Sequence, residues 1–459
     1  MARGGLKILN QEKNIVIIGC GAGGGTAAQF ARKTDRKAKI TVFEQGKYPQ
    51  YSKCGLPYAI SGEIANIPSL IEFSEDWFKK ANIDLFMQTT VEKIDIINKQ
   101  ILANGKQFPF DSLIISTGSK PFIPPIKNID CDGVFCLKTI DDAEKIKKYA
   151  KNAKKATIIG AGLIGLEMAD NLHKLGLNIT VIEALANILP NTLDPDMAKI
   201  VLEKIPDKIK IFTNHIAAKV ENIKGKISKT IITDKSSGEE KTIDTDILII
   251  ATATKPEVEL AKQAGCKIGT TGGIIVNDKA ETSIEDVYAV GDCTEFLDFV
   301  NAKPALVGLG SIAVRQGIAA GTNAAGVSYN LARGVLTTST SKFFGLEIAS
   351  VGPTTENLSD FKCVFARFNG LSLPKYFPGG KSISIKIMVD EYTGMIMAAQ
   401  AVGANAAQRI NTFATAILGQ MDVETLRKLE TAYAPPVAPT LDVVTLVCDM
   451  VSLKLARKK

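Results

Sequence analysis

Short runs of aliphatic residues recur through the first two thirds of the chain, and each is typical of a strand buried on both faces. The run Asn14–Ile18 passes through a glycine-rich turn into a helix-like segment that extends to Arg32, and a second run follows at Ile40–Phe43. The same order returns at Ala156–Ile159 and Ile179–Ile182. Strands that alternate with helices predict βαβ units and a parallel sheet.

The first glycine-rich turn has the spacing of a dinucleotide-binding fingerprint. Gly19, Gly21 and Gly24 form the pattern GxGxxG between a strand and a helix, and Glu44 ends the next strand, 20 residues after Gly24. The first glycine permits the tight turn, the second lets the backbone approach a pyrophosphate, and the third lets helix and strand pack. The helix N-terminus would receive the anion, and Glu44 would accept hydrogen bonds from the ribose hydroxyls.

A second fingerprint indicates a second dinucleotide site. Gly160, Gly162 and Gly165 repeat the pattern, and Glu183 ends the following strand 18 residues after Gly165. Ala184 follows, with no arginine beside it to neutralise a 2′-phosphate, so NAD is favoured over NADP.

Two further patterns place small or acidic residues at strand ends. Residues 111–121 read almost residue for residue like residues 246–256, which predicts that both βαβ units end in the same way. The buried run 286–290 breaks into Gly291 and Asp292, which would aim a carboxylate at a sugar-like hydroxyl. In a doubly wound sheet such strand ends lie at the carboxyl edge, where ligands bind.

The pattern changes near Gly334, and the change defines the predicted domains. Shorter alternating runs such as Ser382–Ile387 precede a helix-like stretch from Ala406 to Leu418, which is typical of an α+β domain. A chain of 459 residues is long enough for two to four domains. We predict an α/β protein with two Rossmann-like domains, residues 12–125 completed by 255–330, and residues 126–254, followed by an α+β domain, residues 331–459.

Composition and charge exclude several classes of protein. With 46% hydrophobic and 22% charged residues the chain is neither disordered nor collagen-like. A net charge of +7 from 55 basic and 48 acidic residues carries no nucleic-acid footprint. No apolar stretch approaches the length that spans a bilayer, and no secretion signal is apparent in Met1–Asn14. We expect a cytoplasmic protein with eight reduced cysteines, no membrane partner and no metal site.

One cysteine stands out because of its surroundings. Cys54 is followed by Gly55, Leu56 and Pro57, a pattern typical of a helix N-terminus. A helix dipole and nearby amides would lower the pKa of the thiol and stabilise a thiolate. Its position between the two fingerprints favours a redox role over that of a small buried hydrophobe.

These motifs together resemble those of the pyridine nucleotide-disulfide oxidoreductase superfamily, in its single-cysteine branch of coenzyme A disulfide reductases, NADH oxidases and NADH peroxidases. The resemblance covers nearly the whole chain. It is carried by the two fingerprints, CGLPY at Cys54, STG at Ser116–Gly118, VGDC at Val290–Cys293 and AYAPP at Ala432–Pro436.

The resemblance implies a homodimer that binds FAD at the first fingerprint and NADH, with NADPH as an alternative, at the second. Cys54 would be the redox-active residue, and Tyr433 of the C-terminal dimerisation domain would reach the partner's active site. The implied cofactor-binding residues are Gly19, Gly21, Ala22, Gly23, Gly24, Glu44, Gln45, Lys53, Val91, Ser116, Thr117, Gly118, Gly291 and Asp292 for the flavin site, and Gly160, Gly162, Leu163, Ile164, Gly165, Glu167, Glu183 and Ala253 for the nicotinamide nucleotide.

Within the superfamily, missing residues narrow the reaction. The only histidines, His173 and His215, lie far from the C-terminus, which excludes the glutathione reductase branch, and Cys131 and Cys136 lie in a connection between domains, where we expect a structural role. Ala22 occupies the position of the histidine that NADH peroxidases and many NADH oxidases carry, and coenzyme A disulfide reductases lack that histidine as well.

The predicted function is therefore reduction of a small disulfide, coenzyme A disulfide or a polysulfide. Thr26, Arg32 and Lys33 of the first helix are candidates for contacts with coenzyme A. An NADH oxidase or peroxidase that cycles Cys54 through a sulfenic acid is the alternative. A flavoprotein redox sensor is a second alternative, because Leu163 and Ala253 replace the usual tyrosine and glycine where nicotinamide stacks.

Overall fold

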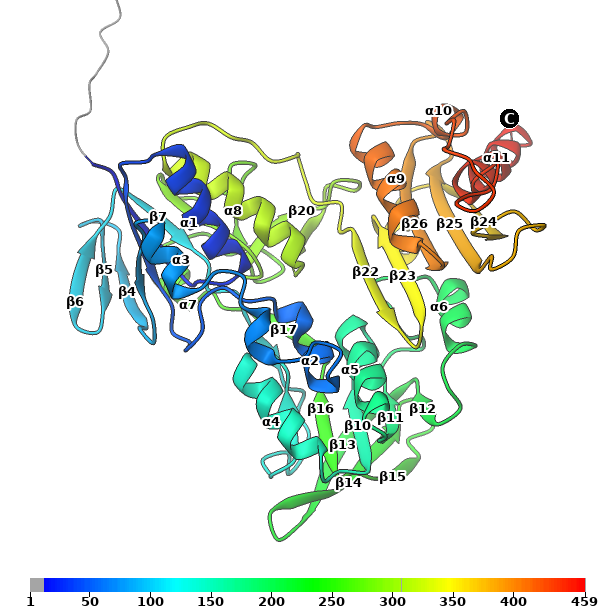
Figure 1. Ribbon diagram of the computed structural model, residues 1–459, viewed down its shortest axis with the longest axis horizontal. Coiled ribbons are helices and arrows are strands. Elements are labelled where there is room, and N and C mark those ends of the chain that lie inside the picture. The colour runs from blue at the N-terminus through cyan, green and yellow to red at the C-terminus, as the bar shows by residue number, and fades with distance from the viewer. Residues whose placement is uncertain (1–11, 307, 459) are drawn as a thin grey trace, which may run out of the picture.

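The computed structural model describes residues 12–306 and 308–458, which form three units (Figure 1). The first and second units are each built on a five-stranded parallel sheet, and the third on a five-stranded antiparallel sheet. The sequence predicts no secretion signal in the N-terminal segment, but residues 1–11 of that segment lie outside the described residues.

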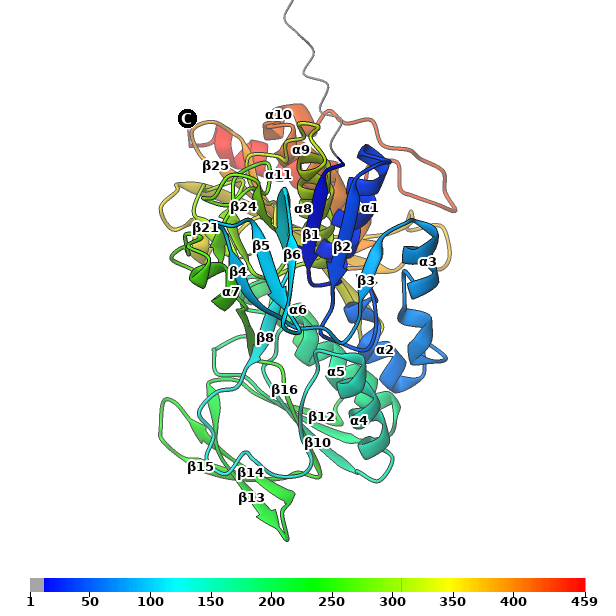
Figure 2. The ribbon, with the colours of Figure 1, turned by 90° about the vertical axis from the view of Figure 1, so that its left-hand side faces the viewer.

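The first unit is a parallel sheet with the strand order β19-β7-β1-β2-β3. Helices α1 and α8 cover one face, and a three-stranded antiparallel sheet, β4-β5-β6, covers the other, as Figure 2 shows. Its elements are β1 (Asn14–Ile18), α1 (Ala22–Thr34), β2 (Lys39–Phe43), α3 (Glu75–Lys80), β3 (Asp84–Phe86), β4 (Val91–Asp95), β5 (Gln100–Ala103), β6 (Lys106–Pro109), β7 (Ser112–Ile115), α7 (Glu259–Gln263), β18 (Ile274–Ile275), β19 (Val287–Ala289), β20 (Thr294–Leu297), β21 (Pro304–Leu306) and α8 (Gly310–Ala324).

Glycines allow α1 and α8 to pack with their backbones in contact. A Cβ at Gly317 of α8 would lie 2.4 Å from the carbonyl oxygen of Gly23, and one at Gly321 would lie 2.3 Å from that of Ala27. Such a close approach excludes any larger residue on α8 at these two positions. The glycine-rich end of α1 is thereby held between the sheet and α8.

The second unit repeats the architecture of the first, with the strand order β12-β11-β10-β16-β9. Strand β10 pairs in parallel with β11 and β16, as β1 pairs with β2 and β7. Its elements are β9 (Val134–Cys136), α4 (Ile140–Ala150), β10 (Lys155–Ile159), α5 (Leu163–Lys174), β11 (Asn178–Ile182), α6 (Pro195–Leu202), β12 (Ile209–Phe212), β13 (His215–Ile223), β14 (Lys226–Asp234), β15 (Glu240–Asp244) and β16 (Ile247–Ile250). Two antiparallel strands, β8 (Ser119–Phe122) and β17 (Ala253–Pro256), connect it to the first unit.

The third unit is an antiparallel sheet with the order β22-β23-β26-β25-β24, packed against helices α9 and α11. Strand β25 is buried along most of its length, and its isoleucines and Val389 belong to the core of this unit. The elements are β22 (Ser339–Phe343), β23 (Leu346–Val351), β24 (Cys363–Leu371), β25 (Ser382–Asp390), β26 (Ile396–Gly403), α9 (Ala406–Leu418), α10 (Val423–Leu426) and α11 (Val443–Ala456).

The predicted fold class is confirmed by this arrangement of two Rossmann-like units and an α+β unit. The predicted strands at Asn14–Ile18 and Ile40–Phe43 and the helix at Ala406–Leu418 match β1, β2 and α9. The domain boundaries stay a prediction. Within the described part of the chain, no helix combines the length and the apolar character needed to cross a bilayer.

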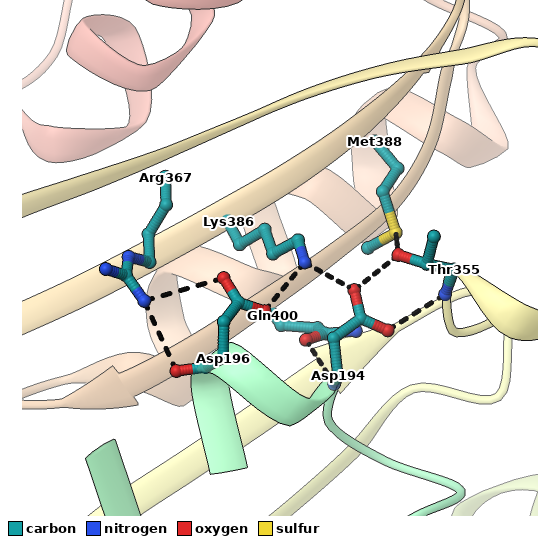
Figure 3. A network of polar contacts seen from close by, with 7 residues as sticks. All are labelled: Asp194, Asp196, Thr355, Arg367, Lys386, Met388 and Gln400. Carbon is teal, nitrogen blue, oxygen red and sulfur yellow. Dashed lines mark hydrogen bonds and ion pairs between the residues drawn. The ribbon is translucent and has the colours of Figure 1, made fainter. Parts of the chain in front are cut away.

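A cluster of buried polar groups joins the second unit to the third (Figure 3). Lys386 of β25 pairs with Asp194 at 2.8 Å and with Asp196 at 2.7 Å, and all but a few per cent of the Lys386 side chain is shielded from solvent. Thr355 donates to the Asp194 carboxylate through its backbone N–H at 2.9 Å and its hydroxyl at 2.5 Å. The side-chain oxygen of Gln400 accepts from the Asp194 N–H at 2.8 Å. This Asp194 cluster therefore anchors the start of α6 on the third unit.

The Asp194 cluster should make stability depend on pH. Burial alone would raise the pKa of Asp194, but the hydrogen bonds from Lys386 and Thr355 outweigh burial and lower it. A carboxyl whose pKa is lowered by folding stabilises the folded protein at every pH above the ordinary pKa of the carboxyl, which is near 4. This stabilisation is lost as the pH falls through the lowered pKa of the folded state.

We expect Lys386→Met to lower the free energy of unfolding by about 3 kcal/mol at pH 7, because the variant leaves a carboxylate buried without its cation. The difference from wild type should shrink as the pH falls below about 4, where the carboxyl is protonated. Thermal unfolding at pH 3 to 7 measures both effects. Lys303→Met, which removes an exposed ion pair with Asp360, is the control and should change little. Equal effects of the two variants would contradict the prediction.

Candidate active site

The first glycine-rich turn brings the backbone of α1 against the backbone of the sheet. Gly19 has a φ of +97°, and a Cβ there would lie 2.2 Å from the carbonyl oxygen of Ser116. A Cβ at Gly24 would lie 1.9 Å from the carbonyl oxygen of Gly19. A Cβ at Gly21 would meet no heavy atom within 4 Å. The fold therefore requires Gly19 and Gly24, whereas Gly21 leaves space open at the N-terminus of α1.

The second turn has the same geometry. Gly160 has a φ of +103°, a Cβ at Gly165 would lie 1.9 Å from the Gly160 carbonyl oxygen, and a Cβ at Gly162 would again meet nothing within 4 Å. Helix α5 thus approaches β10 as α1 approaches β1. Two helix N-termini with open space in front of them can each receive a pyrophosphate.

The two acidic residues at the strand ends are held in equivalent ways. The Glu44 carboxylate accepts the N–H groups of Cys20 and Gly46, both at 2.7 Å. The Glu183 carboxylate accepts those of Ala161 at 2.7 Å and Leu185 at 2.9 Å. Each oxygen keeps a lone pair for a ribose hydroxyl, so both sites fit the adenosine half of a dinucleotide.

The strand ends of the first sheet bring more of the predicted flavin-site residues together. Asp292 lies beyond β19, and its Oδ2 accepts the Ser119 hydroxyl at 2.9 Å. A Cβ at Gly23 would lie 2.8 Å from Val290, directly before Gly291, so this segment lies against α1. Thr117 donates its hydroxyl to the carbonyl oxygen of Glu257. The carboxyl edge of this sheet therefore gathers segments that are distant in sequence, as expected for a ligand site.

Lys138 is a residue of this site that the sequence analysis missed. Its ammonium group lies 2.8 Å from the Ser119 hydroxyl and 3.3 Å from Asp292 Oδ2. Lys138 precedes the capping box with which Thr139 starts α4. No spacing rule points to it, because only the packing of the second unit on the first brings this lysine to Asp292.

Cys54 is the cysteine that is open to solvent, and the other seven are buried or half-buried. It lies in a short 3₁₀ turn, Lys53–Gly55, directly before α2 (Leu56–Ser61). The charges of Glu167, Asp292 and Lys138 all act on its thiol. An accessible thiol surrounded by such groups is suited to redox chemistry.

The expectation that a helix dipole lowers the pKa of Cys54 is wrong for the protein without ligands. Partial burial raises the pKa of the thiol, the negative charges of Glu167 and Asp292 raise it further, and Lys138 opposes them only in part. Helix α2 has six residues and begins after Cys54, so its dipole is small there. Lys53 is also crowded by protein, and burial and the nearby Lys138 lower the pKa of its ammonium.

The nicotinamide-side candidates lie at the start of α5 and on β17. Leu163 is the first residue of α5 and is half-buried, and Ile164 beside it is exposed. The Glu167 carboxylate accepts the hydroxyl of Ser341, which belongs to the third unit. Ala253 is exposed and pairs with Phe122 where β8 and β17 connect the units. Whether Leu163 and Ala253 weaken NADH binding stays a prediction.

The three candidates for coenzyme A contacts on α1 differ in how far their side chains are engaged by the protein itself. Arg32 donates to the backbone carbonyls of Asp35, Arg36, Ala81 and Asn82, at distances from 2.7 to 3.1 Å, so its guanidinium anchors neighbouring turns. Thr26 is buried where α1 packs on Gly317. These contacts within the protein argue against both assignments, which stay predictions. Lys33 is exposed, 4.5 Å from the centre of the Phe30 ring.

The remaining predicted residues frame the first site or lie apart from it. Ala22 begins α1, Val91 begins β4 and is buried, and Gln45 is exposed next to Glu44. Cys131 and Cys136 are half-buried against the aliphatic cluster between β16 and β13, which agrees with a structural role.

Tyr433 is paired with a second tyrosine that the sequence analysis missed. The hydroxyls of Tyr433 and Tyr376 lie 3.0 Å apart, and the two residues are 47% and 72% exposed. The hydrogen bond with Tyr376, and a further one with Thr440, lower the pKa of Tyr433. The AYAPP motif marks Tyr433, whereas Tyr376 lies in the loop between β24 and β25 without a recognisable motif.

A lysine near Glu183 bears on the choice between NAD and NADP. The Lys235 ammonium group donates to the carbonyl oxygen of Ala184 at 3.0 Å. The preference for NAD depends on the absence of a cation next to Glu183 in sequence, and the turn after β14 brings one to Ala184 from 51 residues away. The nucleotide preference stays a prediction, with NADPH as the alternative donor.

Comparison with known proteins agrees with this geometry. The family described as pyridine nucleotide-disulphide oxidoreductase matches residues 13–323, and the dimerisation domain of that family matches residues 338–443. An NADH oxidase of Methanocaldococcus jannaschii is 39% identical, over 96% of this chain and 99% of that protein. An NAD(P)H sulfur oxidoreductase (CoA-dependent) of Pyrococcus furiosus is 36% identical, over 94% and 97%. The solved NAD-dependent persulfide reductase of A. fulgidus superposes with a TM-score of 0.92 at 34% identity, over 97% of this chain and 84% of that one.

Alanine in place of Gly21 or Gly162 should weaken binding at one nucleotide site and leave the other unchanged. Gly21→Ala is expected to fold, because its Cβ meets no protein atom, but to lose at least about tenfold of its flavin affinity, because the methyl occupies the space of the pyrophosphate. Gly162→Ala should keep the flavin and bind NADH about tenfold more weakly. The flavin content of the purified proteins and NADH titration measure the two effects, and each variant is the control for the other. Full flavin occupancy in Gly21→Ala would contradict the assignment of FAD to the first turn.

Proposed function

The chain belongs to the pyridine nucleotide-disulphide oxidoreductase family, and we propose that it uses NAD(P)H and Cys54 to reduce a low-molecular-weight disulfide such as coenzyme A disulfide, or a polysulfide. The observation that carries this proposal is the single exposed thiol, Cys54, on which Asp292 of the first unit and Glu167 of the second both act through their charges. A family enzyme with one such thiol has no second cysteine with which to form an internal disulfide there. Its sulfur is therefore free to pair with a small thiol.

The enzyme is an FAD-dependent oxidoreductase, and FAD and NAD(P)H, when bound, supply the two electrons with which one disulfide and two protons become two thiols. We assign the flavin to the first unit, where Gly21, Glu44 and Asp292 would hold it. We assign the nicotinamide nucleotide to the second unit, where Gly162 and Glu183 would hold it. Both assignments are supported by open helix N-termini and by carboxylates with free lone pairs.

Cys54 acts as the nucleophile of this reaction. Its thiolate attacks one sulfur of the incoming disulfide, a Cys54–sulfur bond forms, and the other half leaves as a thiolate. The raised pKa of Cys54 makes the thiol less ionised but the thiolate more nucleophilic. Lys138 opposes this shift, favours the thiolate and thus supports attack at neutral pH.

The leaving thiolate needs a proton, and the Tyr433–Tyr376 pair is our candidate donor. Both rings are exposed in the single subunit, which supports their use at the active site of a second subunit. The chain carries the dimerisation domain of the family, and we propose that Tyr433 acts across the homodimer. Tyr376 accepts or donates at 3.0 Å and would stabilise Tyr433 while it transfers the proton.

A relative named NADH oxidase supports a second candidate, in which Cys54 cycles through a sulfenic acid. Ala22 argues against it, because a methyl group at the start of α1 cannot assist oxygen or peroxide chemistry as a histidine would. The redox-sensor alternative has no support from these relatives, which are named as an oxidase and an oxidoreductase. Coenzyme A as the thiol and a cytoplasmic location stay predictions.

Anaerobic turnover tests the proposed reaction. NADH should be consumed without oxygen when coenzyme A disulfide or polysulfide is added, and Cys54→Ser should reduce this rate at least about a thousandfold, because it removes the nucleophile. Cys131→Ser removes a half-buried thiol and should not change the rate. Consumption only in the presence of oxygen would favour the oxidase instead.

The tyrosine pair makes a separate prediction for the pH profile. Tyr433→Phe should lower the rate of disulfide reduction about a hundredfold, because a general acid contributes at least that much. Tyr376→Phe removes the hydrogen bond that lowers the pKa of Tyr433, so the alkaline fall in rate should move to higher pH. Tyr392→Phe, at an equally exposed ring of the same unit, is the control. An unchanged rate in Tyr433→Phe would exclude Tyr433 as the donor.

A further inference from the structure

Helix α5 meets the third unit at a hydrogen bond between Ser341 and Glu167. Ser341 lies on β22 and is buried, and its Oγ donates to Glu167 Oε1 at 2.5 Å. Glu167 lies in the second turn of α5, which belongs to the second unit. The bond therefore crosses from one unit to another, and it forms beside the segment that carries Cys54, because α2 packs against α5.

The surrounding core fixes all three segments relative to one another. Leu56 and Ile60 of α2, Leu166 of α5 and Phe343 of β22 belong to one cluster of buried side chains. The backbone of Lys342, next to Ser341, lies 3.5 Å from the hydroxyl of Tyr58 on α2. Because packed cores deform little, Ser341 cannot move away from Glu167 without disturbing α2.

The ionisation of Glu167 bears directly on Cys54. After burial, the negative charge of Glu167 is the largest cause that raises the pKa of the Cys54 thiol. Burial also raises the pKa of Glu167, and the Ser341 hydroxyl opposes that rise by donating to the carboxylate. Without the hydroxyl, Glu167 would take up a proton at higher pH and its charge would be lost from the surroundings of Cys54.

We propose that Ser341 is a positioning residue of the redox centre, whose hydroxyl holds the Glu167 carboxylate in its ionised form and so lets the third unit control the ionisation of Cys54. This inference rests on the proposed role of Cys54. It adds a residue from outside both dinucleotide-binding units to the control of the thiol. Ser341 acts on Cys54 through Glu167.

The other charged groups near Cys54, Glu167 and Ser341 are the same in wild type and in the variants at Ser341 and Glu167. Asp292 and Lys138 face Cys54 from other elements, Lys53 precedes Cys54 in the same 3₁₀ turn, and Lys342 is the exposed neighbour of Ser341. The further titratable groups are Tyr58 on α2, Glu63 just after α2, and Asp170, His173 and Lys174 on α5. Variants at Ser341 and Glu167 leave all of these residues in place. Tyr58 also has a hydrogen bond with Ser341, but burial and the charge of Glu167 raise the pKa of Tyr58 to about 12, above the tested range. A change in the titration of Cys54 therefore reports on the Ser341–Glu167 pair.

The test is the rate at which iodoacetamide alkylates Cys54 in the reduced flavoprotein, followed by peptide mass spectrometry from pH 4.5 to 9. Only the thiolate reacts, so the logarithm of the rate rises with pH. In wild type the slope of this rise should be smaller in the pH range where Glu167 ionises, because the charge that Glu167 gains there raises the pKa of Cys54. We call this part of the profile the shallow region. Glu167→Gln should remove the shallow region and speed alkylation several-fold at neutral pH.

Ser341→Ala should move the shallow region to higher pH by about one to two units, the effect of one hydrogen bond to a charged group. Ser341→Thr keeps the hydroxyl and should restore the wild-type profile. Ser339→Ala is the matched control, because Ser339 lies on the same strand and its hydroxyl lies 3.0 Å from that of Ser350 instead. If Ser341→Ala does not fold, Ser341→Cys, with a weak donor of similar size, should show the same shift.

A shallow region that stays in place in both Ser341→Ala and Ser341→Cys would overturn the proposal. A wild-type profile in Glu167→Gln would overturn it as well, because Glu167 would then not act on the thiol. Both readouts are independent of turnover. Failure of the proposed function would appear elsewhere, as disulfide reduction that persists in Cys54→Ser.

Discussion

The architecture depends on direct contact between backbones at two glycine-rich turns. Helix α1 approaches β1 so closely that a single methyl at Gly24 would lie 1.9 Å from the Gly19 carbonyl oxygen, and α5 approaches β10 in the same way at Gly165 and Gly160. This contact directs each helix N-terminus to the carboxyl edge of its sheet. Both candidate nucleotide sites follow from that geometry.

The surroundings that set the pKa of Cys54 come from three units rather than from one helix. Its short helix, α2, shares a core with α5 and β22, and Glu167, Asp292 and Lys138 come to it from different parts of the chain. The negative charges and partial burial raise the pKa of the thiol, whereas Lys138 lowers it. A bound flavin and a second subunit would change both the burial and the charges, so assembly itself can set the thiolate content.

Two polar contacts hold the second unit to the third at separate places. The Asp194 cluster anchors the start of α6 on β25 and β26, and Ser341 of β22 binds Glu167 of α5. Hydrogen bonds to charged groups tolerate little change in geometry, so together they restrict rotation of the nicotinamide-side unit. The position of that unit relative to the dimerisation domain is thereby restricted as well.

The amino-acid sequence alone determined the fold class and both fingerprints, and it marked Cys54 as the candidate redox cysteine, because local spacing of glycines, apolar runs, acidic strand ends and the CGLPY element carries that information. The strand Asn14–Ile18 and the helix Ala406–Leu418 could be read to the residue. Lys138, Tyr376, Lys235 and Ser341, and the binding of Arg32 to four backbone carbonyls, were decided by the tertiary structure. Each owes its role to a partner at least 50 residues away or to loop geometry. Such contacts arise from packing within and between units, as between Lys138 and Asp292 or Ser341 and Glu167, and tertiary packing has no period in the sequence.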